Sequence, residues 1–269
     1  MCGTALGAAE TVHFPSADVP PTPLQQRLAA DRGAPASTSP GVELSGALFR
    51  PSGTGPFPAL AVLHGCLGPD AVSDQRRVER YLRWGYAVLL IDSFGPRQIA
   101  QDCMPIGTAH ADRLLDALGA LDFLAEQPDI DPGRIAVVGF SSGAGAALSA
   151  LNAPEIAGLG HHRFKAAVAY YPTWCPSSAY AILAPALILT GARDDWNPAP
   201  FCRAAVESRA KGEETVKLVV YAGAEQSFDA IALKGHPLST YGRHFAYDAS
   251  ADDAAAEEMR AFLSKVLRH

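Results

Sequence analysis

Seven short apolar segments, separated by helical patterns, restrict this chain to an α/β architecture. Residues 42–49 alternate apolar and polar side chains and predict a strand at an antiparallel edge. The other segments are almost continuously apolar, as in strands buried on both faces of a parallel sheet. They span residues 59–64, 86–91, 135–140, 166–171, 186–190 and 216–221. We therefore predict a mostly parallel central sheet with helices on both faces.

Two helical stripes support this prediction, one over residues 114–125 and one over residues 259–267. The alternation continues to the last helix without an internal repeat, so residues 41–269 are predicted to form one domain. Residues 1–40, rich in Pro, Ser and Ala, are predicted to form a partly irregular amino-terminal arm. This arm is expected to hold an edge strand at 11–14 and a short helical turn at 25–30.

Charge and cysteine content exclude several classes of protein. The chain has 28 acidic and 22 basic residues, and such an unclustered acidic surface argues against a nucleic-acid partner. No apolar run reaches the ~18 residues that a membrane span needs. The five cysteines form no Cys-x-x-Cys pair, which argues against a structural zinc site. The first ten residues lack the features of an intact signal peptide and are either the remainder of one or a disordered leader.

A Gly-x-Ser-x-Gly motif marks the most informative point in the chain. An apolar strand runs into Gly139-Phe-Ser141-Ser-Gly143, and a small-residue helix follows. Strand, sharp turn and helix are the context in which this motif presents a nucleophilic serine. An alternative is the phosphate loop of a dehydrogenase, but that loop belongs after the first strand, and no Tyr-x-x-x-Lys pair follows here. Ser141 is the predicted nucleophile.

Two further motifs follow apolar strands. His64-Gly-Cys66 lies where an oxyanion loop is expected, so the N–H groups of Cys66 and Ser142 are the predicted oxyanion donors. His64 itself is expected to shape the loop rather than to react. Asp194 follows a later strand at the spacing of an acid that orients a catalytic imidazole, with the neighbouring Asp195 as the alternative.

Together these segments resemble the dienelactone hydrolase family, from about residue 11 to the end. The resemblance also covers Gly55-Pro-Phe-Pro-Ala59, Asp92-Ser-Phe-Gly-Pro-Arg97 and residues 221–229. It implies an α/β-hydrolase fold and hydrolysis of a small-molecule ester or lactone through an acyl-enzyme, with neither metal nor organic cofactor. Many relatives use cysteine as nucleophile, so Ser141 looks more like the esterase branch. A monomer or homodimer without membrane or nucleic-acid partners is expected.

One departure from the family pattern concerns the general base. The family has His in its last motif where this chain has Gln226, and a glutamine cannot take the serine proton. Three explanations stay open: an introduced inactivating substitution, which we favour, natural loss of catalysis, or replacement by His236 or His244. The alternative function is a non-catalytic ligand-binding protein that keeps the hydrolase fold.

The resemblance also suggests residues around the substrate. Arg97 matches a family arginine that holds a substrate carboxylate, but a second family arginine is replaced by Ala230, which puts a dienelactone substrate in doubt. Aromatic residues just beyond strand ends are candidate pocket walls: Tyr171, Trp174, Trp196 and Phe228.

The cysteines follow strands predicted to be neighbours in the sheet. We therefore predict disulfides Cys66–Cys103 and Cys175–Cys202, with Cys2 unpaired. Such pairing would favour a periplasmic or secreted location over a cytoplasmic one.

Overall fold

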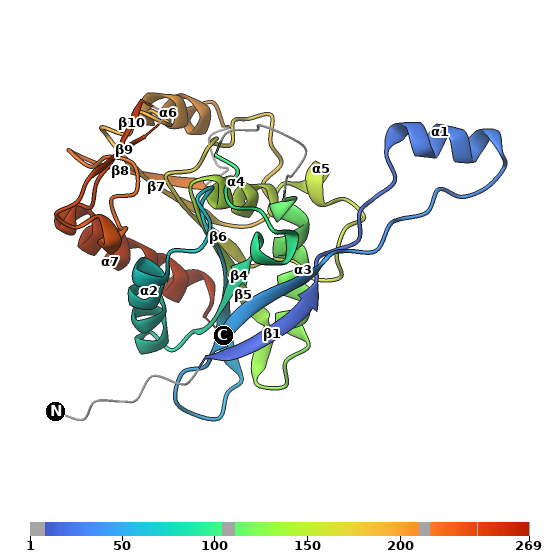
Figure 1. Cartoon of the computed structure of the whole chain (residues 1–269), viewed down its shortest axis with the longest axis horizontal. Coiled ribbons are helices and arrows are strands. Elements are labelled where there is room, and N and C mark those ends of the chain that lie inside the picture. Colours follow the sequence, from blue (N-terminus) through green and yellow to red (C-terminus); the bar gives the residue numbers. More distant parts are fainter. Residues whose placement is uncertain (1–8, 104–110, 210–215, 241, 269) are drawn as a thin grey trace.

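An eight-stranded sheet organises the computed structural model, which describes residues 9–103, 111–209, 216–240 and 242–268 (Figure 1). The strand order is β1-β2-β4-β3-β5-β6-β7-β8. β1 and β2 pair antiparallel, β2 pairs antiparallel with β4, and every later pair is parallel, which confirms the predicted sheet. The bounds are β1 Glu10–Pro15, β2 Glu43–Phe49, β3 Phe57–Leu63, β4 Ala87–Asp92, β5 Ile130–Phe140, β6 Ala166–Tyr170, β7 Ala186–Gly191 and β8 Val216–Tyr221.

Helices cover both faces of the sheet, as predicted. α2 (Ala71–Arg83) and α7 (Ala249–Val266) pack on one face, whereas α3 (Arg113–Ala125) and α4 (Ser142–Ser149) pack on the other. Successive residues of one strand point to opposite faces of the sheet. Val62 therefore belongs to the apolar cluster with α2 and α7, and Leu63 belongs to the cluster with α3 and α4. The body also contains α5 (Ala153–Ile156) and α6 (Ala199–Glu207). Within the described residues, no helix is long and apolar enough to cross a membrane.

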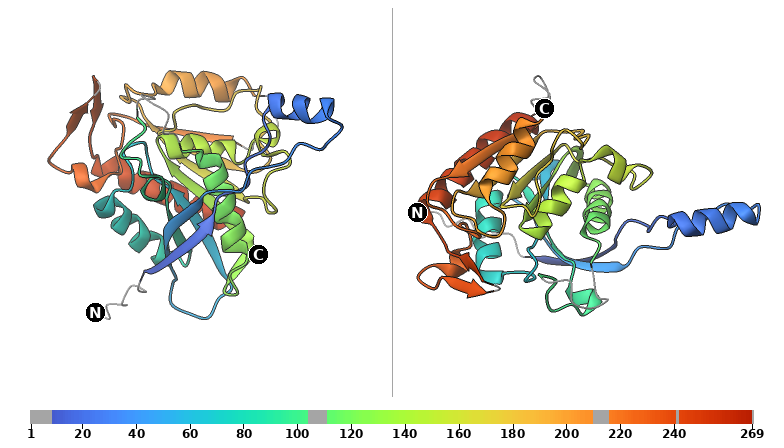
Figure 2. Two further views of the ribbon diagram at one scale, coloured as in Figure 1. Left: turned by 45° about the vertical axis from the view of Figure 1, so that its right-hand side comes forward. Right: turned by 90° about the horizontal axis from the view of Figure 1, so that it is seen from above.

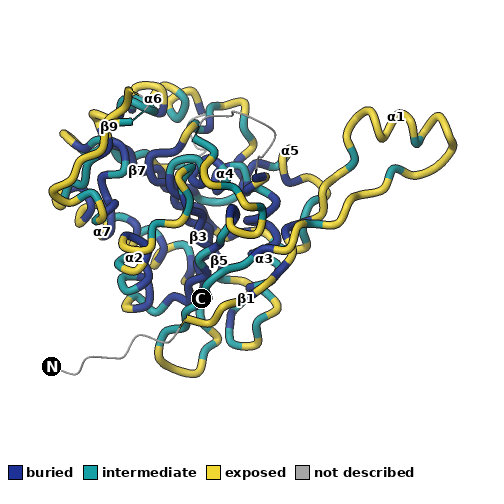
Figure 3. Tube along the Cα trace, in the orientation of Figure 1, coloured by how far each residue is buried: buried dark blue, intermediate teal, exposed yellow. Residues whose placement is uncertain are grey.

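The predicted edge strand is confirmed as β1, which pairs with β2 along its whole length. After β1 the chain leaves the body of the protein as an arm that returns at β2 (Figures 1 and 2). The arm carries α1 (Pro23–Asp31), where a short helical turn was expected. No residue of this helix is buried (Figure 3). A capping box between Thr22 and Gln25 holds its first turn.

Both predicted disulfides are present. Cys66 and Cys103 have Cα atoms 4.7 Å apart, and Cys175 and Cys202 have Cα atoms 5.0 Å apart. The first bond joins the loop after β3 to the loop after β4, and the second joins the loop after β6 to α6. Cys2 lies outside the described residues.

A small hairpin, β9 (Leu238–Thr240) and β10 (Arg243–Phe245), has no counterpart in the sequence-based expectation. Its strands have three residues each, too few for an alternating pattern to be visible. The hairpin lies beside the segment that carries Gln226, because Gln226 forms a parallel bridge with Phe245.

Candidate active site

Ser141 sits on the sharp turn between β5 and α4. Its backbone has φ 53° and ψ −116°, an unfavourable conformation for a residue with a side chain, and its N–H donates to the Tyr170 carbonyl at 3.0 Å. The flanking glycines are required by contact. A Cβ on Gly139 would lie 2.2 Å from the Gly143 carbonyl oxygen, and a Cβ on Gly143 would lie 2.4 Å from the His64 oxygen. The predicted elbow is therefore formed, and the half-buried Ser141 can be reached from solvent.

Gln226 bridges Ser141 and Asp194. One end of its amide lies 3.2 Å from Ser141 Oγ, and the other end lies 2.5 Å from Asp194 Oδ2. A carboxylate only accepts hydrogen bonds, so the amide NH2 faces Asp194 and the amide oxygen accepts from the Ser141 hydroxyl. The structure thus brings together the three residues that the sequence singled out, in the order acid, middle residue, nucleophile.

Asp194 is buried, with 3% of its surface exposed. Its Oδ1 accepts the backbone N–H groups of Trp196 and Asn197, both at 2.9 Å. Burial raises the pKa of this carboxyl to about 6, although the two N–H groups favour the ionised form. A cationic imidazole beside it would lower that pKa, whereas the neutral amide of Gln226 contributes no charge.

The adjacent Asp195 points away from this group. Its Oδ2 lies 2.7 Å from Nδ1 of His244, and its Oδ1 accepts the His244 backbone N–H at 3.1 Å. Burial acts to raise the pKa of Asp195, but the hydrogen bonds from His244 outweigh it and the pKa is lowered. His244 is largely exposed and is held by Asp195 rather than by Ser141, and His236 is exposed as well.

The loop after β3 lies directly against the nucleophile. A Cβ built on Gly65 would be 3.5 Å from the Cβ of Ser141, so the next residue, Cys66, is close to the elbow. Ser142 is the first residue of α4, and its N–H is one of the four at a helix start that have no partner within the helix. Both predicted oxyanion donors therefore belong to segments that meet at Ser141.

Arg113 connects these two segments and was not recognised in the sequence. Its Nη1 donates to the Ser142 hydroxyl oxygen and to the His64 carbonyl, the latter at 3.3 Å. Its Nη2 pairs with Asp102 at 2.6 Å, next to the Cys66–Cys103 disulfide. No local pattern identifies this residue, because the arginine opens α3, 29 residues before the serine that it contacts.

His64 is structural, as expected. Its Nδ1–H donates to the Gly65 carbonyl at 2.7 Å, and its Nε2 accepts the Ser93 backbone N–H at 3.3 Å. Burial lowers the pKa of this imidazole to about 4, so the ring is neutral at pH 7. Both ring nitrogens are thus used to fix the loop.

A buried ion cluster supports the segment that follows Gln226. Arg77 of α2 lies between Asp74 and Asp229, with its Nη1 2.9 Å from Asp74 Oδ1 and its Nη2 2.8 Å from Asp229 Oδ2. The Tyr171 hydroxyl donates to Asp229 Oδ1 at 2.6 Å. The guanidinium also lies 3.7 Å from the ring centre of Phe140, the residue before the nucleophile. α2 contains several charged residues, so the sequence offered no reason to select Arg77.

The structure places the suggested substrate residues differently from the expectation. Arg97 donates to the carboxylate of buried Asp116 at 2.6 and 2.8 Å, so a substrate carboxylate would have to displace that partner. Tyr171 and Phe228 are buried and pack on each other with ring centres 5.6 Å apart, in the core rather than along a pocket. Trp174 and Trp196 are half-buried and stay candidates.

Among the described residues, no group of three or more His, Cys, Asp or Glu side chains is arranged to hold a metal ion. The site consists of a strained serine, the starts of the two segments that carry the predicted oxyanion donors, and a carboxyl–amide chain behind the serine.

Comparison with known proteins relates the chain as a whole to a family of hydrolases. The model of the dienelactone hydrolase family matches residues 44–267. An uncharacterized protein of Mycobacterium tuberculosis is 28% identical over an alignment 222 residues long that covers 76% of each chain. The fold is similar to that of a dienelactone hydrolase-like promiscuous phosphotriesterase from metagenomic libraries, with TM-score 0.66, 20% identity and coverage of 97% of this chain and 100% of the other. It is also similar to that of a thermophilic esterase from Thermogutta terrifontis, with TM-score 0.64, 17% identity and coverage of 84% and 88%.

Proposed function

The chain belongs to the dienelactone hydrolase family, and we propose that it binds a carboxylic ester or lactone over Ser141. We further propose that it hydrolyses this substrate slowly, because the site has no general base. The observation that carries the proposal is the Gln226 amide, 3.2 Å from Ser141 Oγ and 2.5 Å from Asp194 Oδ2. That is where a serine hydrolase needs an imidazole. The site keeps the geometry of the family and lacks its proton acceptor.

The proposed roles follow from where charge develops during acyl transfer. Ser141 Oγ attacks the ester carbonyl, and the carbonyl oxygen becomes an oxyanion that the N–H groups of Cys66 and Ser142 can stabilise. The Ser141 proton has to leave in the same step. An amide oxygen accepts a hydrogen bond but has no useful basicity at neutral pH, so Gln226 holds the hydroxyl without deprotonating it. Asp194 has no cation to orient or stabilise.

The expected cost is large and is confined to the chemical step. Removing one member of such a triad typically costs ~10⁴–10⁶ in rate, while the oxyanion donors and the binding contacts remain. The chain should therefore bind esters and turn them over slowly. Both half-reactions need the base, so an acyl-enzyme that does form should also hydrolyse slowly.

The test restores the missing base. Gln226→His should raise kcat for p-nitrophenyl esters by at least ~10³ with little change in KM, because Ser141, Asp194 and the oxyanion donors are already in place. Gln226→Asn is the matched control, since it alters the same position without adding a base. The gain should vanish when Ser141→Ala is added to Gln226→His, and a fluorophosphonate probe should label Ser141 alone in the active form.

Two results would contradict the proposal. If Gln226→His gives no gain, and His236→Ala or His244→Ala abolishes the activity of the unsubstituted chain, then the base lies elsewhere on the loop. If neither form turns over any ester of two to twelve acyl carbons but both still bind one, the chain is a ligand-binding protein on a hydrolase fold.

A further inference from the structure

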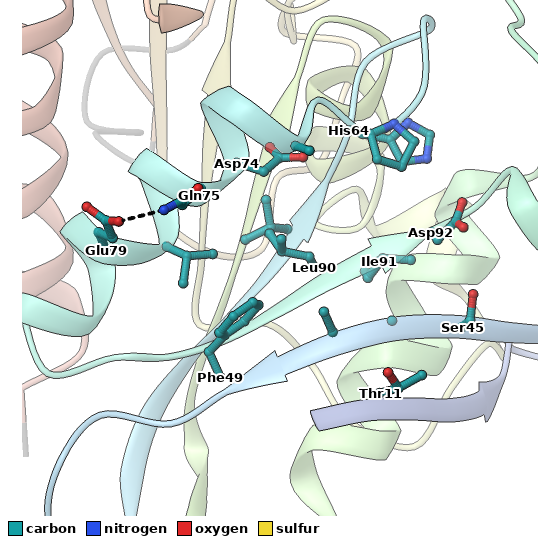
Figure 4. A pocket seen from close by; sticks show the side chains of 16 residues that line it. Thr11, Ser45, Phe49, His64, Asp74, Gln75, Glu79, Leu90, Ile91 and Asp92 are labelled. Carbon is teal, nitrogen blue, oxygen red and sulfur yellow. Dashed lines mark hydrogen bonds between the residues drawn. The ribbon is translucent and has the colours of Figure 1, made fainter. Parts of the chain in front are cut away.

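A cavity lies between α2 and the β1–β2 edge of the sheet, and it has a volume of about 450 Å³ (Figure 4). This volume lies within the range of about 300–1,000 Å³ that is usual for small-molecule sites. Its lining includes neither Ser141, Asp194 nor Gln226. It is thus separate in composition from the ester site.

The cavity exists because β2 carries small residues, Gly46 and Ala47, next to the part of the sheet that α2 covers. Thr11, Ala47, Leu90 and Val62 form a row of paired neighbours across β1, β2, β4 and β3. Val78 of α2 packs in the same apolar cluster as Val62, at the inner end of the row. Ala47 presents only a methyl group nearer the edge, so the space above it stays open. The floor and the inner wall of the cavity are apolar.

The rim of the cavity is acidic. The sixteen described residues that line it include Asp74, Glu79 and Asp92 but no lysine or arginine. Asp74 is paired with Arg77. Glu79 and Asp92 accept hydrogen bonds from neutral donors of the described residues. These donors are Gln75 Nε2 for Glu79 and the backbone N–H groups of residues 94 and 95 for Asp92. Figure 4 shows the two carboxylates at opposite ends of the apolar floor.

We propose that this cavity binds a small amphiphilic cation, with its apolar body over Ala47 and Leu90 and its positive head at Glu79, because Asp92 Oδ1 already accepts two backbone N–H groups. Apolar surface supplies the driving force, and the rim carboxylates Glu79 and Asp92, which form no ion pair with a described residue, select the sign of the head group. An anionic amphiphile such as a carboxylate is disfavoured by the same charges. His64 adds no cation here, because the buried imidazole is neutral at pH 7.

The site shares a wall with the loop beside the nucleophile. The ring of His64 lines the cavity, and the same ring donates to the Gly65 carbonyl. A ligand at this end of the cavity therefore contacts the residue that shapes the Gly65–Cys66 turn. The binding inference itself does not depend on the proposed ester hydrolysis.

The test uses three probes with straight-chain tails and different head groups: hexyltrimethylammonium, hexanol and hexanoate. The hexanoate tail is one methylene shorter, which by itself weakens binding by only about fourfold. Saturable chemical-shift changes in the intact protein, confirmed by calorimetry, should give a dissociation constant for the cation at least about tenfold lower than for hexanoate, with hexanol between them. The shifts should map to residues of β2, β4 and α2.

Two substitutions locate the site. Ala47→Trp fills the floor and should weaken binding of the cation by more than about tenfold, whereas Ala34→Trp, on the exposed arm, should leave it unchanged. Because a tryptophan at position 47 could destabilise the sheet, Glu79→Gln provides a second measurement: it should reduce the preference for the cation over hexanoate and leave hexanol binding unaltered.

The proposal is overturned by any of four results. The first two are the absence of saturable binding by all three probes and equal binding of hexanoate and the cation. The third is that folded Ala47→Trp binds the cation as tightly as the unsubstituted chain does. The fourth is that Glu79→Gln keeps the full preference for the cation over hexanoate. A change of sedimentation mass in folded Ala47→Trp would assign the cavity to a second copy of the chain and would overturn the proposal as well.

Discussion

Two neighbouring aspartates in this protein have different partners. Asp194 is buried and faces Gln226, which in turn contacts Ser141. Asp195 is turned outward and holds the imidazole of His244, whose side chain is 63% exposed. The chain thus contains an Asp–His pair of the kind that activates a serine, but the pair uses Asp195, whereas the aspartate that faces Gln226 and Ser141 is Asp194. Whether an aspartate can serve the nucleophile therefore depends on the side of the backbone to which its side chain points, and not on its proximity in the sequence.

The alternation of side chains explains why the imidazole points outward. Phe245 forms the bridge with Gln226, is 8% exposed and packs near Trp196, with ring centres 5.8 Å apart. Successive residues of an extended segment point to opposite sides, so burying Phe245 directs His244 to the surface. To bring His244 inward would require a shift of one residue in the pairing, and this would expose Phe245.

The largest predicted effect separates the two aspartates by activity. In the Gln226→His background, Asp194→Asn should lower kcat by about 10³–10⁴, because the new imidazole loses the partner that sets its tautomer and stabilises its charge. Asp195→Asn, made in the same background, is the matched control and should change kcat less than about threefold. Equal losses from the two substitutions, or a larger loss from Asp195→Asn, would reverse the assignment.

A smaller effect concerns stability against pH. The folded pKa of Asp194 is about 6 and the unfolded reference value is 3.8, so the folded protein binds this proton more tightly. Its contribution to the free energy of unfolding is therefore full below pH 4 and falls as pH rises from about 4 to 6, by up to ~3 kcal/mol.

Urea denaturation at half-unit pH steps measures this effect. The difference in unfolding free energy between the unsubstituted chain and Asp194→Asn should fall across this window, since asparagine does not titrate there. Asp195 should act in the opposite sense, because its pKa is lowered: it stabilises above its unfolded pKa, and this contribution is lost as pH falls through the lowered value. A flat difference for Asp194→Asn would show that folding does not raise the pKa of this carboxyl.

The smallest predicted effect is that of His244→Ala. The His244–Asp195 pair is exposed, and such pairs contribute about 0–1 kcal/mol, so the midpoint of unfolding should move little. The activity of the Gln226→His form should change less than about twofold. Chemical denaturation and ester hydrolysis, measured on the same preparation, test both statements. A loss of most residual activity in the chain with Gln226 intact would instead identify His244 as its base.

Sequence reasoning was most successful where one local pattern has one structural solution. The strand–Gly-x-Ser-x-Gly–helix segment folds as an elbow because the two glycines admit the close contacts at residues 139 and 143. It was less successful for Tyr171 and Phe228, since an aromatic residue after a strand can line a pocket or fill a core. The motif around Arg97 predicts a contact with a substrate carboxylate, but in the structure the Arg97 guanidinium pairs with Asp116 of α3.

The sheet, the elbow and both disulfides could be predicted from the sequence, because each depends on residues within one segment or on the order of strands. Three contacts became apparent only in the folded chain: Asp194 rather than Asp195 faces Gln226, Arg113 joins the loop after β3 to α4, and Arg77 links α2 to the segment after Gln226. These contacts join residues 29 to 152 positions apart. Their energy depends on distance and burial in the folded chain, to which no local pattern in the sequence corresponds.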